Sequence, residues 1–285
     1  MLYISSACIK SNNIVNSVKE IAKYGYKNIE LSGGTKYLVG YEKELLRLKE
    51  SLHLNYQIHN YFPPPKSPFM LNLCSNNELI IDKSLDLCSE ALRISKIFKG
   101  THYGIHAGFL IDFSYKEAGK RIKKRKLLDK YVAIKNFKES WAKLKERANG
   151  TKLYLENNVV SRTNFKTYGT NPFLLTNYED YIELKRHLDF NLLLDVAHLK
   201  VSANTLGLNF KEQLFKLLPF TDYVHLSDNN SLSDQNKGLK ENSELIRYLK
   251  EFPFKKKTTF TFEIYSGINQ VANSIDIFKK NLKFI

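Results

Sequence analysis

Short apolar runs that end in an acidic residue or a histidine recur along the whole chain, and they constrain its fold strongly. Successive run ends are 29 to 50 residues apart, which leaves room for one helix and its loops each time. A parallel β/α fold has this spacing, and it brings the carboxyl ends of its strands to one face. We therefore expect the residues at the run ends to converge on one site: Glu30, His59, His106, Glu156, Asp195, His225 and Glu263.

Extended and helical patterns alternate along the sequence. Their order predicts a single-domain (β/α)8 TIM barrel over residues 1–285. The first predicted strand is followed by Ser5-Ser6-Ala7 and not by a GxGxxG pattern, which argues against a dinucleotide-binding sheet. Strands are predicted at 2–6, 28–31, 56–59, 102–106, 152–156, 191–195, 222–225 and 258–263. Helices are predicted at 14–24, 42–51, 76–98, 127–148, 178–186, 211–218, 243–252 and 271–282.

Composition limits the class of protein. With 285 residues, of which 43% are apolar, the chain can bury a full core, and one α/β barrel commonly uses about 250 residues. No apolar run reaches the roughly 18 residues of a membrane span, and the first residues lack a signal-peptide pattern, so we expect no membrane partner. Cys8, Cys74 and Cys88 form no CxxC pair. We therefore expect no disulfide framework and a cytoplasmic protein.

The net charge of +15 is concentrated in one segment. Residues 115–147 hold 13 Lys and Arg against 4 Asp and Glu, which gives 13 − 4 = +9. Apolar residues at steps of three and four from residue 127 onward predict an amphipathic helix with a lysine-rich outer face. This basic segment is either a contact surface for phosphate or nucleic acid, or a solvated outer face. The second interpretation is favoured.

Four of the seven run ends come from consecutive strands, the fifth to the eighth, and they carry the chemistry of a metal site. Glu156, Asp195, His225 and Glu263 offer three carboxylates and one imidazole. Such groups bind Mn²⁺, Zn²⁺, Mg²⁺ or Co²⁺ and leave coordination positions for substrate oxygens. Without a cation, three buried carboxylates would repel one another and would be costly to remove from water. The sequence therefore predicts a divalent metal cofactor.

Short motifs around these residues resemble a known family. The motifs are LYLENN at Glu156, LLLDVAH at Asp195 and His198, VHLSD at His225 and Asp228, and FTFEIY at Glu263. In order, spacing and strand context they are similar to the xylose-isomerase-like barrel superfamily, over nearly the whole chain. That superfamily includes sugar isomerases and epimerases, inosose dehydratases and endonuclease IV.

The resemblance to ketose 3-epimerases implies an isomerase or epimerase of a sugar or sugar phosphate. Glu156 and Glu263 would then be the acid/base pair, beside a cation that polarises the substrate carbonyl. The same two glutamates, with Asp195 and His225, would bind that cation. The residues expected to contact the substrate are His198, Asp228, His59, His106 and Tyr61. Glu30 is expected to support a ligand histidine, and a homo-oligomer is left open.

A second resemblance points to endonuclease IV, a metal-dependent hydrolase of abasic-site DNA. His59 and His106 stand at ligand positions of that enzyme, which implies a second metal, and residues 69–77 resemble one of its loops. Asn236 stands where the enzyme has a metal-binding histidine, so a complete third metal site is not expected. DNA hydrolysis and dehydration of a keto-polyol are therefore the alternatives, and nucleic acid is the less favoured partner.

Overall fold

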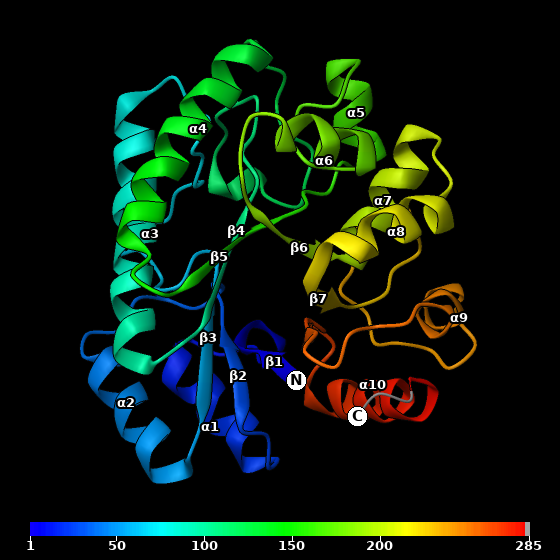
Figure 1. The fold of residues 1–285 in the computed structure, drawn as a ribbon. Helices are drawn as coiled ribbons and strands as arrows, with labels where there is room; N and C mark the ends of the chain where they lie inside the picture. Colours follow the sequence, from blue (N-terminus) through cyan, green and yellow to red (C-terminus); the bar gives the residue numbers. More distant parts are fainter. Residues whose placement is uncertain (283–285) are drawn as a thin grey trace.

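A computed structural model, described here for residues 1–282, folds into a closed barrel of parallel strands (Figure 1). The strands follow one another in chain order around the barrel, and β8 pairs with β1 to close it. The predicted (β/α)8 TIM barrel is confirmed. The strands are β1 (Leu2–Ser5), β2 (Asn28–Leu31), β3 (Asn55–His59), β4 (His102–His106), β5 (Lys152–Glu156), β6 (Asn191–Asp195), β7 (Thr221–Leu226) and β8 (Thr259–Phe262).

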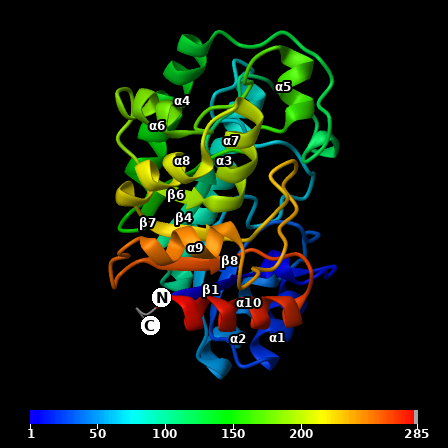
Figure 2. The same cartoon turned by 90° about the vertical axis from the view of Figure 1, so that its right-hand side faces the viewer.

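Helices surround the strands on the outside of the barrel (Figures 1 and 2). The eight predicted helices correspond to α1–α4, α6 and α8–α10, while α5 and α7 match no predicted helix. The helices are α1 (Ile14–Lys23), α2 (Tyr41–Leu52), α3 (Glu78–Phe98), α4 (Lys130–Arg147), α5 (Arg162–Tyr168), α6 (Tyr178–Lys185), α7 (Val196–Leu206), α8 (Phe210–Leu217), α9 (Glu244–Glu251) and α10 (Ile268–Asn281).

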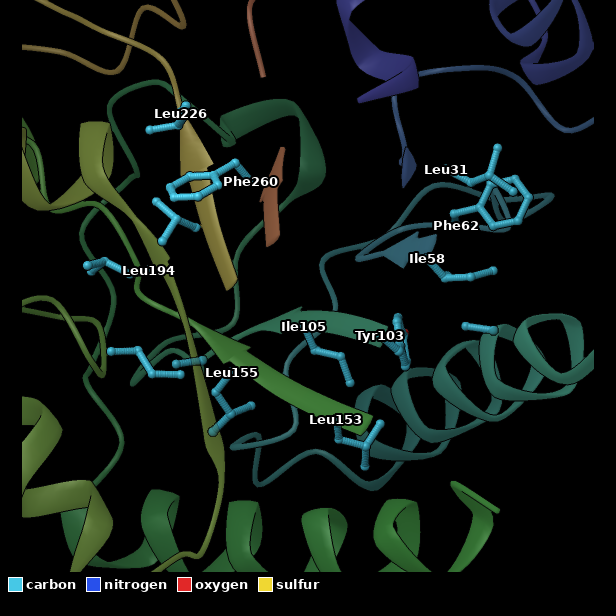
Figure 3. Close-up of a cluster of buried hydrophobic side chains, with 14 of the residues drawn as sticks. Leu31, Ile58, Phe62, Tyr103, Ile105, Leu153, Leu155, Leu194, Leu226 and Phe260 are labelled. Carbon is cyan, nitrogen blue, oxygen red and sulfur yellow. The ribbon is translucent and has the colours of Figure 1, made fainter. Parts of the chain in front are cut away.

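The two faces of the sheet differ in character because successive side chains of a strand point to opposite sides. Outward-facing residues such as Ile58, Ile105, Leu155 and Leu194 belong to the main hydrophobic core and pack toward the helices (Figure 3). Inward-facing residues are largely polar or aromatic. Tyr154, Leu193 and Tyr223 form a small separate cluster. The barrel interior therefore carries polar groups, and the layer between sheet and helices supplies most of the apolar burial.

A second, smaller core lies among the loops that follow the strands. It consists of Phe109, Ile111, Ile122, Val160 and Phe173. Ile122, only 2% exposed, belongs to residues 115–129, which we call the basic loop. The backbone N–H of Ile122 donates to Asn164 Oδ1 (2.9 Å), and the Tyr168 hydroxyl donates to the Lys123 carbonyl (2.8 Å). These contacts with α5 hold the basic loop in place.

The predicted helix at 127–148 begins three residues late. Asp129 is the N-cap of α4, and its side chain accepts from the backbone N–H of Val132 (3.0 Å). The preceding Leu128 donates its backbone N–H to the Leu110 carbonyl (2.7 Å). The backbone before Asp129 therefore forms a hydrogen bond with the loop after β4 and does not continue as a helical turn. All seven Lys and Arg of 115–126 therefore lie on the basic loop, ahead of the helix.

All three cysteines, Cys8, Cys74 and Cys88, are buried and free. No helix within residues 1–282 combines the length and the apolar character that crossing a bilayer requires.

Candidate metal centre

The register of the sheet brings the predicted ligands together in pairs. His106 at the end of β4 lies opposite Glu156 at the end of β5, and Asp195 of β6 lies opposite His225 of β7. Glu263 is the residue directly after β8. The loops that follow these strands gather on the right-hand side of Figure 2, which is the carboxyl-terminal face of the barrel. Enzymes with this fold carry their catalytic residues on that face.

Glu156, Asp195, His225 and Glu263 form one buried group. One ligand atom of each lies within 4.8 Å of the ligand atoms of the others. His225 Nδ1 is 3.1 Å from Glu156 Oε1 and 3.1 Å from Glu263 Oε2. The structure therefore brings together the four residues that the sequence predicts as metal ligands.

Several polar atoms in this group have unused bonding capacity. Within the described part of the chain, Glu156 Oε1, Asp195 Oδ2 and His225 Nδ1 are buried and have no hydrogen-bond partner. Buried polar atoms in folded proteins nearly always have one. Carboxylate oxygen and imidazole nitrogen are also the atoms that bind divalent cations. The residues present thus fit a cation, which would satisfy all three atoms.

The electrostatics point the same way. Burial raises the pKa of Asp195 to about 7, and the neighbouring carboxylates of Glu156 and Asp234 add to the effect against the opposing charge of His198. Burial would also raise the pKa of Glu263, but the close contact and charge of His225, whose Nδ1 is 3.1 Å from Glu263 Oε2, outweigh it and lower that pKa to about 2. Protonation of Asp195 near neutral pH limits the crowding of negative charge. A divalent cation would let all the carboxylates ionise together.

His59 and His106 lie on the other side of Glu156. His59 Nε2 is 2.8 Å from Glu156 Oε2, and His106 Nδ1 is 3.0 Å from the same oxygen. Burial lowers the pKa of His106 to about 4, so its imidazole is neutral and can act as a ligand. Glu156 therefore presents one oxygen to the four-residue group and the other to the two histidines. His106 forms a candidate ligand group with Glu156 and His198, and His59 forms another with Glu30 and His225, so a second metal held by His59 and His106 together stays a prediction.

His198 borders the group from α7. Its Nδ1 is 2.9 Å from the Asn157 carbonyl oxygen, its Nε2 is 3.3 Å from Asp234 Oδ2, and that Nε2 is 3.9 Å from Asp195 Oδ2. Asp234 reaches His198 from the loop after β7. The predicted substrate contact His198 therefore lies beside the candidate metal centre, between two carboxylates.

Two other predicted substrate contacts have partners in their own surroundings. The Tyr61 hydroxyl accepts from the backbone N–H of Leu71 (2.9 Å) and lies 3.5 Å from Met70 Sδ. Asp228 Oδ1 accepts from Lys200 Nζ (2.7 Å). Neither residue belongs to the groups of candidate ligands. Their contact with substrate stays a prediction.

Two site residues were not singled out from the sequence. The side chain of Asn157 accepts from the Asp195 backbone N–H (2.7 Å) and donates to the Asp195 carbonyl (3.0 Å), so it fixes the end of β6. The Tyr265 hydroxyl donates to Glu263 Oε1 (2.7 Å). Each lies one or two residues beyond a predicted ligand, and that proximity is the only signal that the sequence offers for them.

The fold and the site together define a (β/α)8 barrel with candidate metal ligands at the carboxyl ends of its strands. The sequence matches the family described as xylose isomerase-like TIM barrel over residues 18–284, and the chain belongs to this family. No curated protein matches the chain in sequence.

Solved structures share the fold at low sequence identity. A D-tagatose 3-epimerase-like protein matches with a TM-score of 0.72 and 20% identity, covering 98% of this chain and 96% of its own. The 3-keto-D-glucoside 4-epimerase of E. coli matches with a TM-score of 0.64 and 15% identity, covering 98% and 97%. Endonuclease IV from Thermus thermophilus matches with a TM-score of 0.61 and 16% identity, also covering 98% and 97%. Proteins named as sugar epimerases and as an endonuclease thus share this architecture.

Proposed function

We propose that the protein is a divalent-metal-dependent isomerase or epimerase of a sugar or sugar phosphate. The observation that carries the proposal is the pair of buried carboxylates Glu156 and Glu263, each 3.1 Å from His225 Nδ1. Moving a hydrogen beside a carbonyl needs one group that removes a proton and one that returns it. Two carboxylates that face one centre meet this need. The names of the epimerases that share the fold support the same reaction class.

The side chains of the site have separable tasks in this reaction. Burial would raise the pKa of Glu156, but the charges of neighbouring histidines outweigh it and hold that pKa well below its usual range. His225 has the same effect on Glu263. Both carboxylates are therefore ionised at neutral pH, and either can accept the substrate proton. The Tyr265 hydroxyl holds Glu263 Oε1 and leaves Oε2 directed toward the centre. When bound, a divalent cation polarises the substrate carbonyl and eases removal of the adjacent proton.

The positive charge of the basic loop favours a phosphorylated substrate over a neutral one. Residues 115–129 hold seven Lys and Arg against two Asp and Glu, which gives 7 − 2 = +5. Ile122 anchors the basic loop in the smaller core, so the charged side chains lie among the loops that follow the strands. Positive potential near a site raises the local concentration of an anionic ligand, and salt screens the effect. We therefore expect kcat/KM for a sugar phosphate to fall with added salt, and kcat/KM for the matching neutral sugar to change little.

Exchange of a carbon-bound substrate proton with solvent tests the proposal. Protein loaded with Mn²⁺ is incubated with ketoses and ketose phosphates in D₂O, and deuterium incorporation is followed by NMR. We expect exchange in the wild type and its loss in Glu156→Gln and in Glu263→Gln. Glu139→Gln, at an exposed position on α4, is the matched control and should exchange normally. The Mn²⁺ content of each variant is measured in parallel. Exchange retained in both site variants would refute the acid/base assignment.

One observation favours a second candidate function. His59 and His106 both approach Glu156 Oε2, and a shared carboxylate between two metals suits hydrolysis of a phosphodiester. The candidate is an endonuclease IV-like hydrolase of abasic-site DNA. Zn²⁺-loaded protein is incubated with a duplex that contains one abasic site and with an intact duplex. Cleavage of the first alone, lost in His106→Ala, would establish this function in place of sugar chemistry.

A further inference from the structure

Glu30 is a fully buried carboxylate whose hydrogen-bond partners lie across the barrel interior, while His59 Nδ1 of the neighbouring β3 is 3.9 Å from its Oε1. Glu30 belongs to β2, whereas its partners Tyr223, His225 and Thr261 belong to β7 and β8. All four residues are 0% exposed. Burying a carboxylate costs free energy unless donors surround it, so a carboxylate in such a position requires an explanation.

Three donors converge on Glu30. The Tyr223 hydroxyl and Thr261 Oγ1 both donate to Glu30 Oε2, the latter at 2.8 Å. His225 Nε2 lies 3.2 Å from Oε2 and 3.2 Å from Oε1. An ionised carboxylate can only accept hydrogen bonds. The contact with Glu30 therefore places a proton on Nε2 of His225.

The other nitrogen of the same ring faces the candidate metal centre. His225 Nδ1 is 3.1 Å from Glu156 Oε1 and from Glu263 Oε2, and it has no hydrogen-bond partner among residues 1–282. A neutral imidazole with its proton on Nε2 has a lone pair on Nδ1. The hydrogen bond at one nitrogen thus decides which nitrogen is available to a metal.

We propose that Glu30 is a positioning residue that holds His225 with Nε2 protonated and Nδ1 directed toward the cation, and so sets the affinity of the centre for divalent metal. The inference rests on the metal centre of the proposed function, but not on its sugar chemistry. The carboxylate makes the imidazole a stronger electron donor, and the rigid contacts with Tyr223 and Thr261 keep the carboxylate from turning away. In this role Glu30 acts through His225 and is not one of the four ligands of the centre, although one of its oxygens lies within 4.8 Å of ligand atoms of His59 and His225.

A merely structural role makes a different prediction. If Glu30 only fills space between the strands, a side chain of the same size with a hydrogen-bond acceptor should serve equally well. Glu30→Gln keeps the volume and one acceptor oxygen, and its amide can donate to the oxygens of Tyr223 and Thr261. It removes the negative charge and exchanges one acceptor oxygen for a donor. Thr261→Val is the matched control, because it deletes a donor to the same carboxylate oxygen without altering the contact with His225.

The test measures Mn²⁺ affinity by the EPR signal of free Mn²⁺, with the tautomer of His225 read by ¹⁵N NMR. We expect the Kd of Glu30→Gln to rise about tenfold and that of Thr261→Val to stay within about twofold, in line with the effect of outer contacts on metal ligands. With diamagnetic Zn²⁺ bound in place of Mn²⁺, we also expect the wild-type His225 to carry its one ring proton on Nε2. Thermal unfolding in EDTA checks the fold of each variant. A variant whose Tm is similar to that of the wild type folds normally.

Two results would overturn the proposal. One is a Glu30→Gln variant that binds Mn²⁺ with the wild-type Kd, and the other is a wild-type His225 that carries its proton on Nδ1. If Glu30→Gln does not fold, the tautomer of the wild-type protein still decides the question. Neither the Mn²⁺ affinity nor the tautomer depends on turnover of a sugar. A negative result in the deuterium exchange assay would therefore leave this proposal testable.

Discussion

Individual residues inside this barrel have little freedom, because side chains from several strands meet in a narrow space. Glu156 contacts His59, His106 and His225 at once. Its position at the end of an apolar run made it a predictable ligand. The partners of Glu30 could not be predicted in the same way, because Tyr223 and Thr261 lie some 200 residues away in sequence and reach it only through barrel closure. Sequence position therefore predicts the site residues better than it predicts their hydrogen bonds.

Gly104 shows how little space the interior leaves. A Cβ at this position of β4 would lie 2.7 Å from Leu193 Cδ2 and 2.9 Å from His59 Cδ2. Gly104→Ala should therefore displace His59 from Glu156 and lower the free energy of unfolding by about 1–3 kcal/mol, the usual cost of overpacking. Urea unfolding and Mn²⁺ titration measure the two effects. Wild-type values in both measurements would show that the interior can adjust.

Metal binding should depend on pH, because protons compete for the ligands. Burial raises the pKa of Asp195 to about 7. Burial would lower the pKa of His225, but the charges of Glu30 and Glu156 outweigh it and raise that pKa well above its usual value. Both groups must lose a proton to bind a cation, so affinity should fall as the pH decreases. Below the pKa, we expect the Kd for Mn²⁺ to rise about tenfold per pH unit for each proton released. Calorimetry at pH 6, 7 and 8 in buffers of different ionisation enthalpy counts these protons, and a pH-independent Kd would contradict the expectation.

At the scale of elements, α7 links structure and chemistry most directly. It starts one residue after Asp195, and Asp195 Oδ1 accepts from the His198 backbone N–H (2.8 Å) as the N-cap. The sequence does not reveal this helix, because the strand passes into it without a loop and its segment lacks a clear apolar period. The position of the same aspartate predicts a ligand and not a cap. The short polar helix α5 also lacks a clear apolar period, so the sequence does not predict it.

The two tasks of Asp195 can be separated by substitution. Asp195→Asn keeps an oxygen that can cap α7 but weakens metal binding, whereas Asp195→Ala loses both. In EDTA, we expect Asp195→Ala to unfold at least about 1 kcal/mol more easily than Asp195→Asn, the usual value of an N-cap. Urea unfolding gives this difference, and Mn²⁺ titration should show weak binding for both variants. Equal stability of the two variants in EDTA would mean that the cap contributes little here.

At the scale of the whole molecule, the alternation of strands and helices made the barrel predictable, since chain order fixes which strands are neighbours. The number of strand ends that carry metal-ligand side chains then indicated where the candidate site lies. The substrate could not be predicted in the same way, because the loops that surround the site owe their shape to long-range contacts. The basic loop is an example. The burial of Ile122 and its hydrogen bond with Asn164 fix the loop, and no local sequence pattern predicts these contacts.

Removal of metal should destabilise the entire barrel, because ligands from four consecutive strands and adjacent loops share one centre. A cation that binds only the folded state at a free concentration of 100 times its Kd adds about 2.7 kcal/mol of stability. For a chain of 285 residues, that corresponds to a rise in Tm of roughly 4–5 °C. Thermal unfolding in Mn²⁺ and in EDTA measures the shift. Glu139→Gln should show the full shift, and Glu263→Gln a smaller one. Equal Tm values with and without Mn²⁺ in the wild type would mean that the folded state does not bind the cation.

The division of each strand into an outward apolar face and an inward polar face has an evolutionary consequence. Residues such as Leu155 and Leu194 hold the helices, while their neighbours Glu156 and Asp195 face the centre. Substitutions at alternate positions can therefore alter the reaction while the scaffold persists, and drift in the scaffold can leave the reaction untouched. One barrel scaffold can in this way acquire a different reaction without passing through an unfolded intermediate.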